Sequence, residues 1–253
     1  MRKVILFLVV FSSFLLNSFL LRADNQDINK IVWLTEEYQP YNYSENNIPK
    51  GIFVDILVEI WKKIGLNKQV TDIQIVPWAR GYKLAQEDVK TCLFSMAYTE
   101  ERTKLFKFTS PLVKSDTSLI AKKSKNLKIK SIEDAKKLKI GVVREDIGEE
   151  LVLKAGIDKN QIEQSNNAQN MSKKLDLDRL DAVAYEFGTL AWNMKLENID
   201  SSKYEEIYLL EKGETCFAFH KDIDPNILAK VQKAIGELKA DGTVEKIVQK
   251  YTK

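Results

Sequence analysis

Apolar and polar positions in the first half of the chain follow two periods, one typical of buried strands and one typical of helices. In residues 52–66 the apolar side chains recur at helical spacing, and Gly65 is suited to end that helix. Residues 44–51 are polar turn material. The predicted elements are a strand at 31–34, a helix at 52–66, a strand at 73–78, a helix at 79–88 and a strand at 91–97. This order favours a mostly parallel sheet flanked by helices.

The second half of the chain repeats this alternation and then returns to an apolar strand. The predicted strands are at 117–123, 139–143, 161–166 and 181–186, and the predicted helices are at 131–138, 147–157, 167–180 and 187–196. A strand at 214–221 precedes two helices that break at Asp241 and Gly242. Because no low-complexity linker separates the two units, we expect two lobes joined by strands. A small molecule would bind between them, near the carboxyl ends of the strands.

The N-terminus has the pattern of a secretory signal peptide. A short basic start is followed by a long apolar run, and the polar segment begins after Ala23. We therefore predict a signal peptide at residues 1–23 and a periplasmic or secreted mature protein. The alternative is an uncleaved membrane anchor, because the apolar run is long enough to span a bilayer. No cysteine lies near the predicted cleavage site, which excludes lipid attachment to a mature N-terminal cysteine.

Removal of residues 1–23 changes the charge of the chain. This segment contains Arg2, Lys3 and Arg22 and no acidic residue, so the mature chain has 36 basic and 36 acidic residues. The excess of basic residues in the full sequence thus comes from the signal segment alone. Nothing remains to indicate a basic face for nucleic acid, and we expect no nucleic-acid partner.

Cys92 and Cys216 are the only cysteines, and His220 is the only histidine. An even number of cysteines in an exported chain is consistent with a disulfide bond. The alternative is two small buried apolar side chains. With a single histidine, these residues make a poor metal site, since structural zinc normally takes four ligands. We expect neither a metal nor a cofactor.

Five segments of the chain, in order, are similar to those of one protein family. The segments are YQPYNY with PKGIFVDIL, SMAYTEERTKLFKFTSPL, SIEDAKKLKIGVVRED, RLDAVAYE and LKADGTVEKIVQKY. Together they cover essentially the whole mature chain. The sequence resembles the family 3 extracellular solute-binding proteins of ABC importers, the class that includes polar amino acid receptors.

The resemblance implies an α/β fold of the two-lobed periplasmic binding protein class (Venus-flytrap, type II) with a strand hinge. Residues 24–112 and 213–253 would form the first lobe, and residues 113–212 the second. Ligand binding would close the hinge. In such a fold the strands that carry Cys92 and Cys216 are expected to be neighbours, which leaves the disulfide open.

The resemblance assigns Arg102 to the position of an arginine that grips the α-carboxylate of a ligand. A guanidinium presents paired donors that match a carboxylate. The alternative is an ion pair between Arg102 and Glu100 or Asp116 on a solvated helix. Glu186 follows the Asp-Ala-Val strand, where the family has an acid for the ligand α-ammonium group. Its alternative is an ordinary glutamate at a strand end.

Other positions depart from the pattern of amino acid receptors. Ala97 stands where the family often has a small hydroxyl residue, two positions before Thr99. Arg144, Glu145 and Asp146 replace a Gly-Thr-type loop. Arg144 is either a second anion contact or the partner of Glu145 or Glu149. The remaining predicted ligand contacts are aromatic walls and polar wall residues, namely Tyr38, Tyr41, Trp78, Tyr98, Glu37 and Arg80. The alternative for Trp78 is core packing after Pro77.

The leading functional prediction is a binding protein and not an enzyme. It would capture a small polar ligand, anionic or zwitterionic and amino acid-like, and deliver it as a monomer to an ABC permease of the cytoplasmic membrane. One alternative is a periplasmic enzyme that resembles cyclohexadienyl dehydratase, with Glu186 or Glu145 as the acid or base. The other is a module that reports the ligand to a signalling partner.

Overall fold

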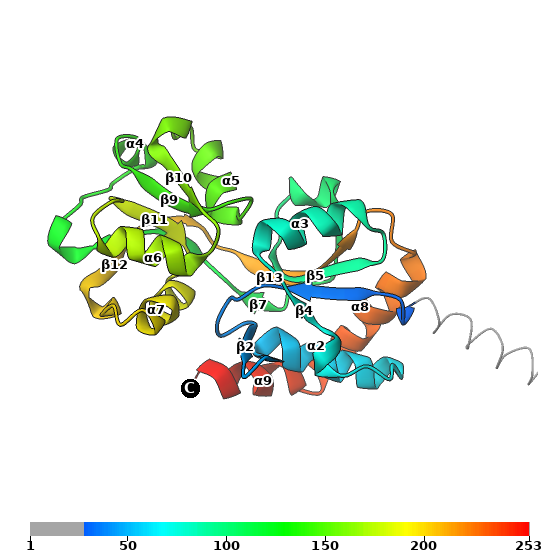
Figure 1. The fold of residues 1–253 in the computed structure, drawn as a ribbon. Helices are drawn as coiled ribbons and strands as arrows, with labels where there is room; N and C mark the ends of the chain where they lie inside the picture. The colour runs from blue at the N-terminus through cyan, green and yellow to red at the C-terminus, as the bar shows by residue number, and fades with distance from the viewer. Residues whose placement is uncertain (1–27, 253) are drawn as a thin grey trace, which may run out of the picture.

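Two separate β-sheets organise residues 28–252, the part of the chain that this computed structural model describes (Figure 1). Each sheet is flanked by helices and forms the centre of one lobe. The predicted signal peptide lies outside the described residues. Within residues 28–252, no helix is both long enough and apolar enough to cross a membrane.

The sheet of the first lobe has the strand order β4-β1-β5-β13-β6, and β7 also pairs with β13. β1 runs parallel to β4 and β5, whereas β13 is antiparallel to β5. The strands are β1 (Val32–Thr35), β4 (Gln74–Ile75), β5 (Thr91–Ala97), β6 (Phe106–Phe108), β7 (Val113–Lys114) and β13 (Glu214–His220). A separate hairpin of β2 (Tyr43–Glu45) and β3 (Ile48–Lys50) occupies the segment that the sequence indicated as turn material.

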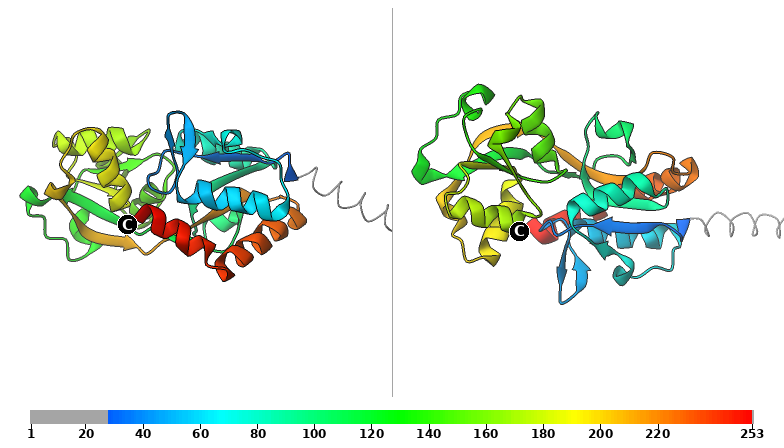
Figure 2. Two further views of the ribbon diagram at one scale, coloured as in Figure 1. Left: turned by 90° about the horizontal axis from the view of Figure 1, so that it is seen from below. Right: turned by 45° about the horizontal axis from the view of Figure 1, so that its top comes forward.

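Within the described residues, four helices cover this first sheet. They are α2 (Ile52–Ile64), α3 (Trp78–Glu87), α8 (Pro225–Ala240) and α9 (Thr243–Thr252). Figure 2 shows α2, α8 and α9 side by side, and each of the three contacts the other two. The buried face of α2 carries the predicted apolar residues, and Gly65 ends the helix in the left-handed region. The prediction placed Trp78 in a strand, but Pro77 stops β4 and Trp78 begins α3.

The sheet of the second lobe has the order β10-β9-β11-β8-β12. β10, β9 and β11 are parallel, and β8 is antiparallel to both β11 and β12. Its elements are β8 (Thr117–Lys122), α4 (Ile132–Ala135), β9 (Ile140–Val143), α5 (Ile147–Lys154), β10 (Ile162–Ser165), α6 (Ala168–Asp176), β11 (Ala182–Tyr185), α7 (Phe187–Leu196) and β12 (Tyr204–Glu211). The sequence did not predict β12, because its apolar and charged positions follow no clean alternation.

The chain passes between the lobes twice, from β7 to β8 and from β12 to β13. The two crossings lie side by side, since the Ser115 amide donates to the Gly213 carbonyl at 2.9 Å. A Cβ at position 213 would lie 2.4 Å from the Ser115 carbonyl oxygen, so this crossing requires glycine. Val113 and Lys114 pair with β13 in the first sheet, whereas the sequence-based division began the second lobe at residue 113.

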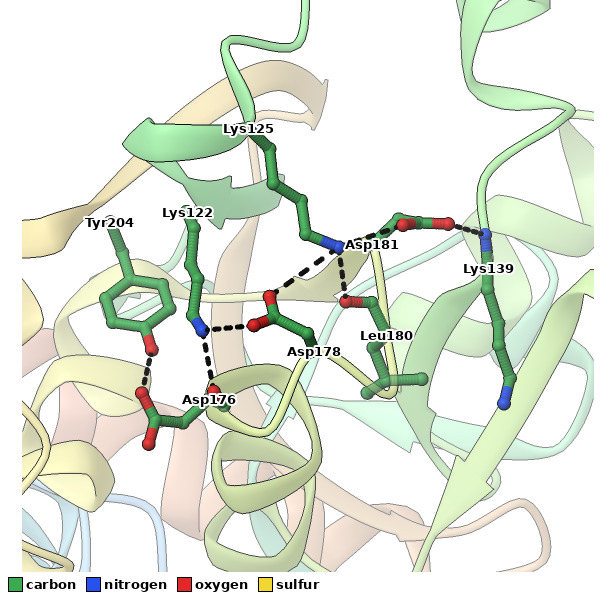
Figure 3. A network of polar contacts seen from close by, with 8 residues as sticks. All are labelled: Lys122, Lys125, Lys139, Asp176, Asp178, Leu180, Asp181 and Tyr204. Atoms are coloured by element: carbon green, nitrogen blue, oxygen red, sulfur yellow. Dashed lines mark hydrogen bonds and ion pairs between the residues drawn. The ribbon is translucent and has the colours of Figure 1, made fainter.

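A network of lysines and aspartates joins β8 to the end of α6 on the second lobe (Figure 3). Lys125 Nζ lies 2.9 Å from Asp181 Oδ1, and Lys122 Nζ lies 3.1 Å from Asp178 Oδ2. The Tyr204 hydroxyl donates to Asp176 Oδ1 at 2.7 Å, which ties β12 to the same network. These contacts lie at the ends of β8 and β12 that are away from the crossings, and they fasten α6 to the sheet.

Candidate functional site

Two hollows lie between the lobes, and residues from both lobes line each of them. The first, of about 340 Å³, is the Glu36 pocket; Glu36, Pro77 and Trp78 face Asn167 and Asn193 of the second lobe there. The second, of about 670 Å³, is the Arg102 pocket. It is lined by Tyr82, Tyr98, Thr99 and Arg102 of the first lobe and by Ile147, Glu150 and Lys154 of the second. Both volumes are in the range of small-molecule sites.

Side chains of the first lobe bind α5 and the loop before it, between the two hollows. Trp78 begins α3, and its indole Nε1 donates to the Glu145 carbonyl oxygen at 2.7 Å. Glu145 has a φ of 61°, a left-handed conformation that turns its carbonyl toward the first lobe. The sequence identified Trp78 as an aromatic wall. The structure buries its ring and uses its polar edge to join the lobes.

Arg102 is only 1% exposed, and its partner comes from the opposite lobe. Its Nε donates to Glu150 Oε1 at 2.9 Å, and its Nη2 lies 2.9 Å from the same oxygen. The guanidinium carbon lies 5.5 Å from the Trp78 ring centre and 5.3 Å from that of Tyr82. The alternative of an ion pair with Glu100 or Asp116 is therefore wrong as to the partner. Arg102 links the two lobes and does not lie on the solvent-exposed face of a helix.

The turn that carries Arg102 is held by the residues before it. Arg102 opens the 3-10 turn η2 (Arg102–Lys104), and the Thr99 hydroxyl accepts from its backbone amide at 3.1 Å. The Ala97 carbonyl, at the end of β5, accepts from Arg102 Nη1 at 3.3 Å. Thr99 and Ala97, both predicted as ligand contacts, thus position Arg102. Thr99 acts through its side chain and Ala97 through its backbone carbonyl.

Asp146 is buried and caps α5, with its Oδ1 accepting from the Ile147 amide at 2.7 Å. Burial raises the pKa of its carboxyl group to about 6, although Arg102 and the capping hydrogen bond favour the charged form. Glu149 and Glu150 on the same helix raise that pKa further. The carboxyl therefore titrates close to neutral pH.

Glu36 follows β1 directly and lines the Glu36 pocket. Its backbone carbonyl accepts from Asn42 Nδ2 at 2.7 Å, and Asn42 is in turn bonded to the hydroxyl of Ser95 at an irregularity of β5. Burial, followed by the charge of Asp146, raises the pKa of the Glu36 carboxyl well above its ordinary value. Among the described residues, this carboxylate forms neither a hydrogen bond nor an ion pair, so it faces the hollow without a partner.

Tyr38 and Tyr41 turn their hydroxyls toward the hinge. The Tyr38 hydroxyl lies 2.9 Å from Ser115 Oγ, and the Tyr41 hydroxyl donates to the Lys114 carbonyl at 3.0 Å. Their rings stack at 4.9 Å, and Tyr38 meets Tyr185 of the second lobe edge to face at 5.7 Å. Burial raises the pKa of both phenols, so both remain neutral. Their hydroxyls support the strands that connect the lobes.

Glu186 occupies the N-terminus of α7, where its carboxylate accepts from the amides of Gly188 and Thr189 at 2.9 and 2.6 Å. Glu186 thus caps a helix, a role that differs from both the ligand contact and the ordinary strand-end glutamate that the sequence left open. Its charge still reaches the cleft, because it raises the pKa of both Tyr38 and Tyr41 after burial does.

Of the other predicted contacts, Tyr98 lines the Arg102 pocket and Glu37 lines the Glu36 pocket, whereas Arg80 and Arg144 line neither. Arg144 is exposed, and its Nε donates to Gln164 Oε1 at 3.2 Å instead of pairing with Glu145 or Glu149. Arg80 is exposed on α3, and among the described residues its side chain has no polar partner. Glu37 accepts from the Ser44 amide and hydroxyl, and half-exposed Tyr98 donates to Glu100.

Cys92 and Cys216 lie on neighbouring strands, as expected, but both thiols are free and buried. Cys92 is opposite Phe219 and Cys216 is opposite Met96, so the two side chains do not face each other in the sheet. Within residues 28–252, no group of three or more histidine, cysteine, aspartate or glutamate side chains is arranged to hold a metal ion.

The sequence did not indicate Glu36, Glu150 or Tyr82. Glu36 carried one usable signal, because it follows a buried strand whose carboxyl end meets the cleft. Glu150 is one of several acids on a short helix, and nothing in the sequence says which of them reaches the other lobe.

The chain matches the family model of bacterial extracellular solute-binding proteins, family 3, over residues 31–253. The protein belongs to this family. The probable amino-acid-binding protein YxeM of Bacillus subtilis (strain 168) is 26% identical over 233 residues, which cover 90% of this chain and 86% of that protein. The arginine-binding extracellular protein ArtP of the same organism is also 26% identical, over 87% of this chain and 85% of its own.

The fold of this family member is that of the two-lobed periplasmic binding proteins, as predicted. A solved histidine kinase sensor domain with similarity to periplasmic binding proteins superposes with a TM-score of 0.78 at 16% identity, covering 88% of this chain and 95% of that one. At that identity the likeness concerns the fold alone. The two curated relatives are named as binding proteins and not as enzymes.

Proposed function

We propose that this protein captures a small, amino acid-like solute with a positively charged group, outside the cytoplasmic membrane, and delivers it to an ABC import permease. The solute binds in the Glu36 pocket, between the first lobe and α6 and α7 of the second. Trp78 forms an apolar wall of that pocket. Closure of the lobes over the solute uses the strand hinge at Ser115 and Gly213.

The unpaired carboxylate of Glu36 carries this proposal. A partly buried acid without a donor is costly, and a cationic ligand group would supply the missing partner. Asp146 adds a second acidic group close enough to raise the pKa of Glu36. Arg102, the basic group that lowers this pKa, is already paired with Glu150. The unpaired groups of the cleft are therefore acidic, and a cationic ligand group would favour their ionised forms, which favours a cationic or zwitterionic solute over a simple anion.

The relatives support the same ligand class. ArtP is named for arginine, an amino acid with a cationic side chain. The volume of the Glu36 pocket, about 340 Å³, lies at the lower end of the range for small-molecule sites and suits a single amino acid.

The test is a calorimetric titration of residues 24–253 with arginine, lysine and histidine at pH 7.5. Glu36→Gln keeps the shape of the side chain and removes its charge, and we expect it to weaken binding by about tenfold or more. Glu87→Gln is the matched control, because that acid at the end of α3 is exposed, pairs with Lys83 and lines neither hollow. It should leave the affinity within about twofold.

Two results would overturn the proposal. One is a wild-type protein that binds none of the three amino acids. The other is an equal loss of affinity in both variants, which would show that the acid beside the pocket does not meet the ligand. Uptake of labelled arginine by cells that carry wild-type or Glu36→Gln protein then tests delivery to the permease.

A further inference from the structure

Asn193 on α7 is the most deeply buried polar residue that lines the Glu36 pocket from the second lobe, with an exposed fraction of 6%. Its Nδ2 donates to the Thr189 carbonyl, one turn earlier on the helix, at 2.9 Å. A carbonyl can accept only from the nitrogen of a carboxamide, so this bond fixes which atom of the side chain is the oxygen. Among the described residues no donor bonds Asn193 Oδ1, which remains an acceptor at the hollow.

A hydrogen bond between the lobes holds α7 against the loop that carries Glu36. The buried Thr189 hydroxyl donates to the Gln39 carbonyl at 2.7 Å, and Gln39 lies three residues after Glu36. Glu186 fixes the start of the same helix by capping it. The carboxamide of Asn193 and the carboxylate of Glu36 therefore line one hollow from opposite lobes.

The side-chain nitrogens of the buried and half-buried residues around this hollow are used within the protein. The Trp78 indole donates to a backbone carbonyl of the second lobe, and Gln169 Nε2 donates to Glu197. Asn193 Nδ2 is bonded within its own helix. The groups that remain are acceptors, with the Glu36 carboxylate on one side and Asn193 Oδ1 on the other. Acceptors without donors favour a ligand group that carries several N–H bonds.

We propose that Asn193 is a specificity-determining residue of the Glu36 pocket: with Glu36 it accepts hydrogen bonds from the cationic group of the solute, so that the pocket selects primary ammonium and guanidinium groups over cations without N–H bonds. The inference rests on the proposed function, because it concerns the same solute in the same pocket. Glu36 attracts any cation by its charge, whereas the uncharged oxygen of Asn193 stabilises only a hydrogen-bond donor. Charge and donors are thus recognised by different residues on different lobes.

The experiment separates the donors of the solute from its charge. Nε-trimethyl-lysine keeps the positive charge of lysine and lacks the N–H bonds of its side chain. Nω,Nω-dimethylarginine keeps the charge of arginine and has two fewer donors. Calorimetric titrations at pH 7.5 give the ratio of affinities within each pair. We expect wild-type protein to bind the unmethylated amino acid about tenfold more tightly or better.

Asn193→Leu removes the acceptor and keeps the approximate volume of the side chain. The ratio within each pair should fall by about threefold or more, because the unmethylated amino acid loses a hydrogen bond. The bulk of the methyl groups is the same in both proteins, so the change of the ratio reports the hydrogen bond. The affinity for Nε-trimethyl-lysine should change by less than about twofold, which also shows that the variant is folded. Asn193→Ala, with the residue that favours helix most, is a second variant that removes the same acceptor.

Asn160→Leu is the matched control. It makes the same substitution at an exposed asparagine of the second lobe that lines neither hollow. Each affinity, and the ratio within each pair, should stay within about twofold of the wild type. A ratio that falls as far in Asn160→Leu as in Asn193→Leu would refute a specific role of Asn193.

The outcomes separate this inference from the proposed function. Equal binding of methylated and unmethylated amino acids by the wild type would overturn the inference and leave the proposed function standing, because charge alone would then suffice. A ratio in Asn193→Leu equal to that of the wild type would also overturn the inference alone. Failure of both lysine and arginine to bind would overturn the inference, and failure of histidine as well would overturn the proposed function.

Discussion

The ion pair of Arg102 and Glu150 and the lysine–aspartate network of the second lobe use the same chemistry in opposite surroundings. Arg102 is 1% exposed, and one carboxylate oxygen faces two of its nitrogens. In the network of Figure 3 the side chains of Lys125 and Asp178 are 22% and 60% exposed. Water can replace each partner in the network, whereas burial deprives Arg102 of that substitute.

This difference explains what each set of charges does. The exposed network ties β8 to α6 within one lobe, and each of its contacts contributes little free energy. The buried pair connects two lobes whose relative position determines the shape of the cleft. The buried guanidinium of Arg102 cannot be solvated, so it must keep Glu150 as its partner. The pair therefore constrains the relative position of the two lobes.

The largest expected effect follows from removal of the buried charge. Arg102→Ala leaves a space beside Trp78 and Tyr82 and leaves Glu150, whose side chain is 33% exposed, to be solvated, and we expect it to lower the free energy of unfolding by about 2–3 kcal/mol. Urea unfolding followed by circular dichroism measures this change. A loss below about 1 kcal/mol would show that the pair behaves like the exposed network.

A smaller effect, opposite in sign, is expected at Asp146. Its pKa in the folded protein is about 6, above the ordinary value of 3.8, so the folded state binds this proton more tightly than the unfolded chain does. Asp146 stabilises the folded state fully below pH 4. This contribution is lost as the pH rises through 6, where the buried carboxyl must ionise. Asp146→Asn should therefore raise the free energy of unfolding by about 2 kcal/mol at pH 8 and leave it nearly unchanged at pH 4.

Several ionisable groups face Asp146, and they are present in both the wild type and Asp146→Asn. The stabilities of the two proteins are therefore compared at each pH separately. These groups are Glu36, Arg102, Glu149, Glu150, Tyr38 and Tyr185. Thermal unfolding of the wild type and the variant between pH 4 and 8 gives the difference. A variant that is less stable at pH 8 would show that the capping charge matters more than its burial.

The smallest effect is expected in the network of the second lobe. Lys125→Ala removes ion pairs to Asp178 and Asp181, and we expect it to lower the free energy of unfolding by less than about 1 kcal/mol. Addition of 0.5 M salt should abolish this difference and leave most of the effect of Arg102→Ala. A loss at Lys125 equal to that at Arg102 would remove the distinction between buried and exposed pairs.

Much of the fold could be predicted because each element depends on its own residues. The apolar face of α2, its end at Gly65 and the break of the last helices at Gly242 all follow from local preferences. The strand β12 and the hairpin of β2 and β3 could not be predicted in this way. They are stabilised by pairing with distant strands or across a turn, and their sequences carry weak patterns.

The candidate site was harder to predict, because its residues act across the cleft. Arg102 was indicated by its resemblance to a family motif and Asp146 by its place in the segment that replaces a Gly-Thr-type loop. The partner of each could not be read from the sequence. Trp78 and Glu145 are 67 residues apart, and Arg102 and Glu150 are 48 apart. No local pattern couples such pairs.

The sequence by itself determined the two α/β units, the family and the position of an arginine at the end of β5. These depend on periodicity, caps and motifs that each segment carries alone. Only the tertiary structure decided that the carboxylate at Arg102 is that of Glu150 and that Glu36 lines a hollow without a polar partner among residues 28–252. The physical reason is that pairing of charges depends on burial and on distance through space, and both arise only when the two lobes meet.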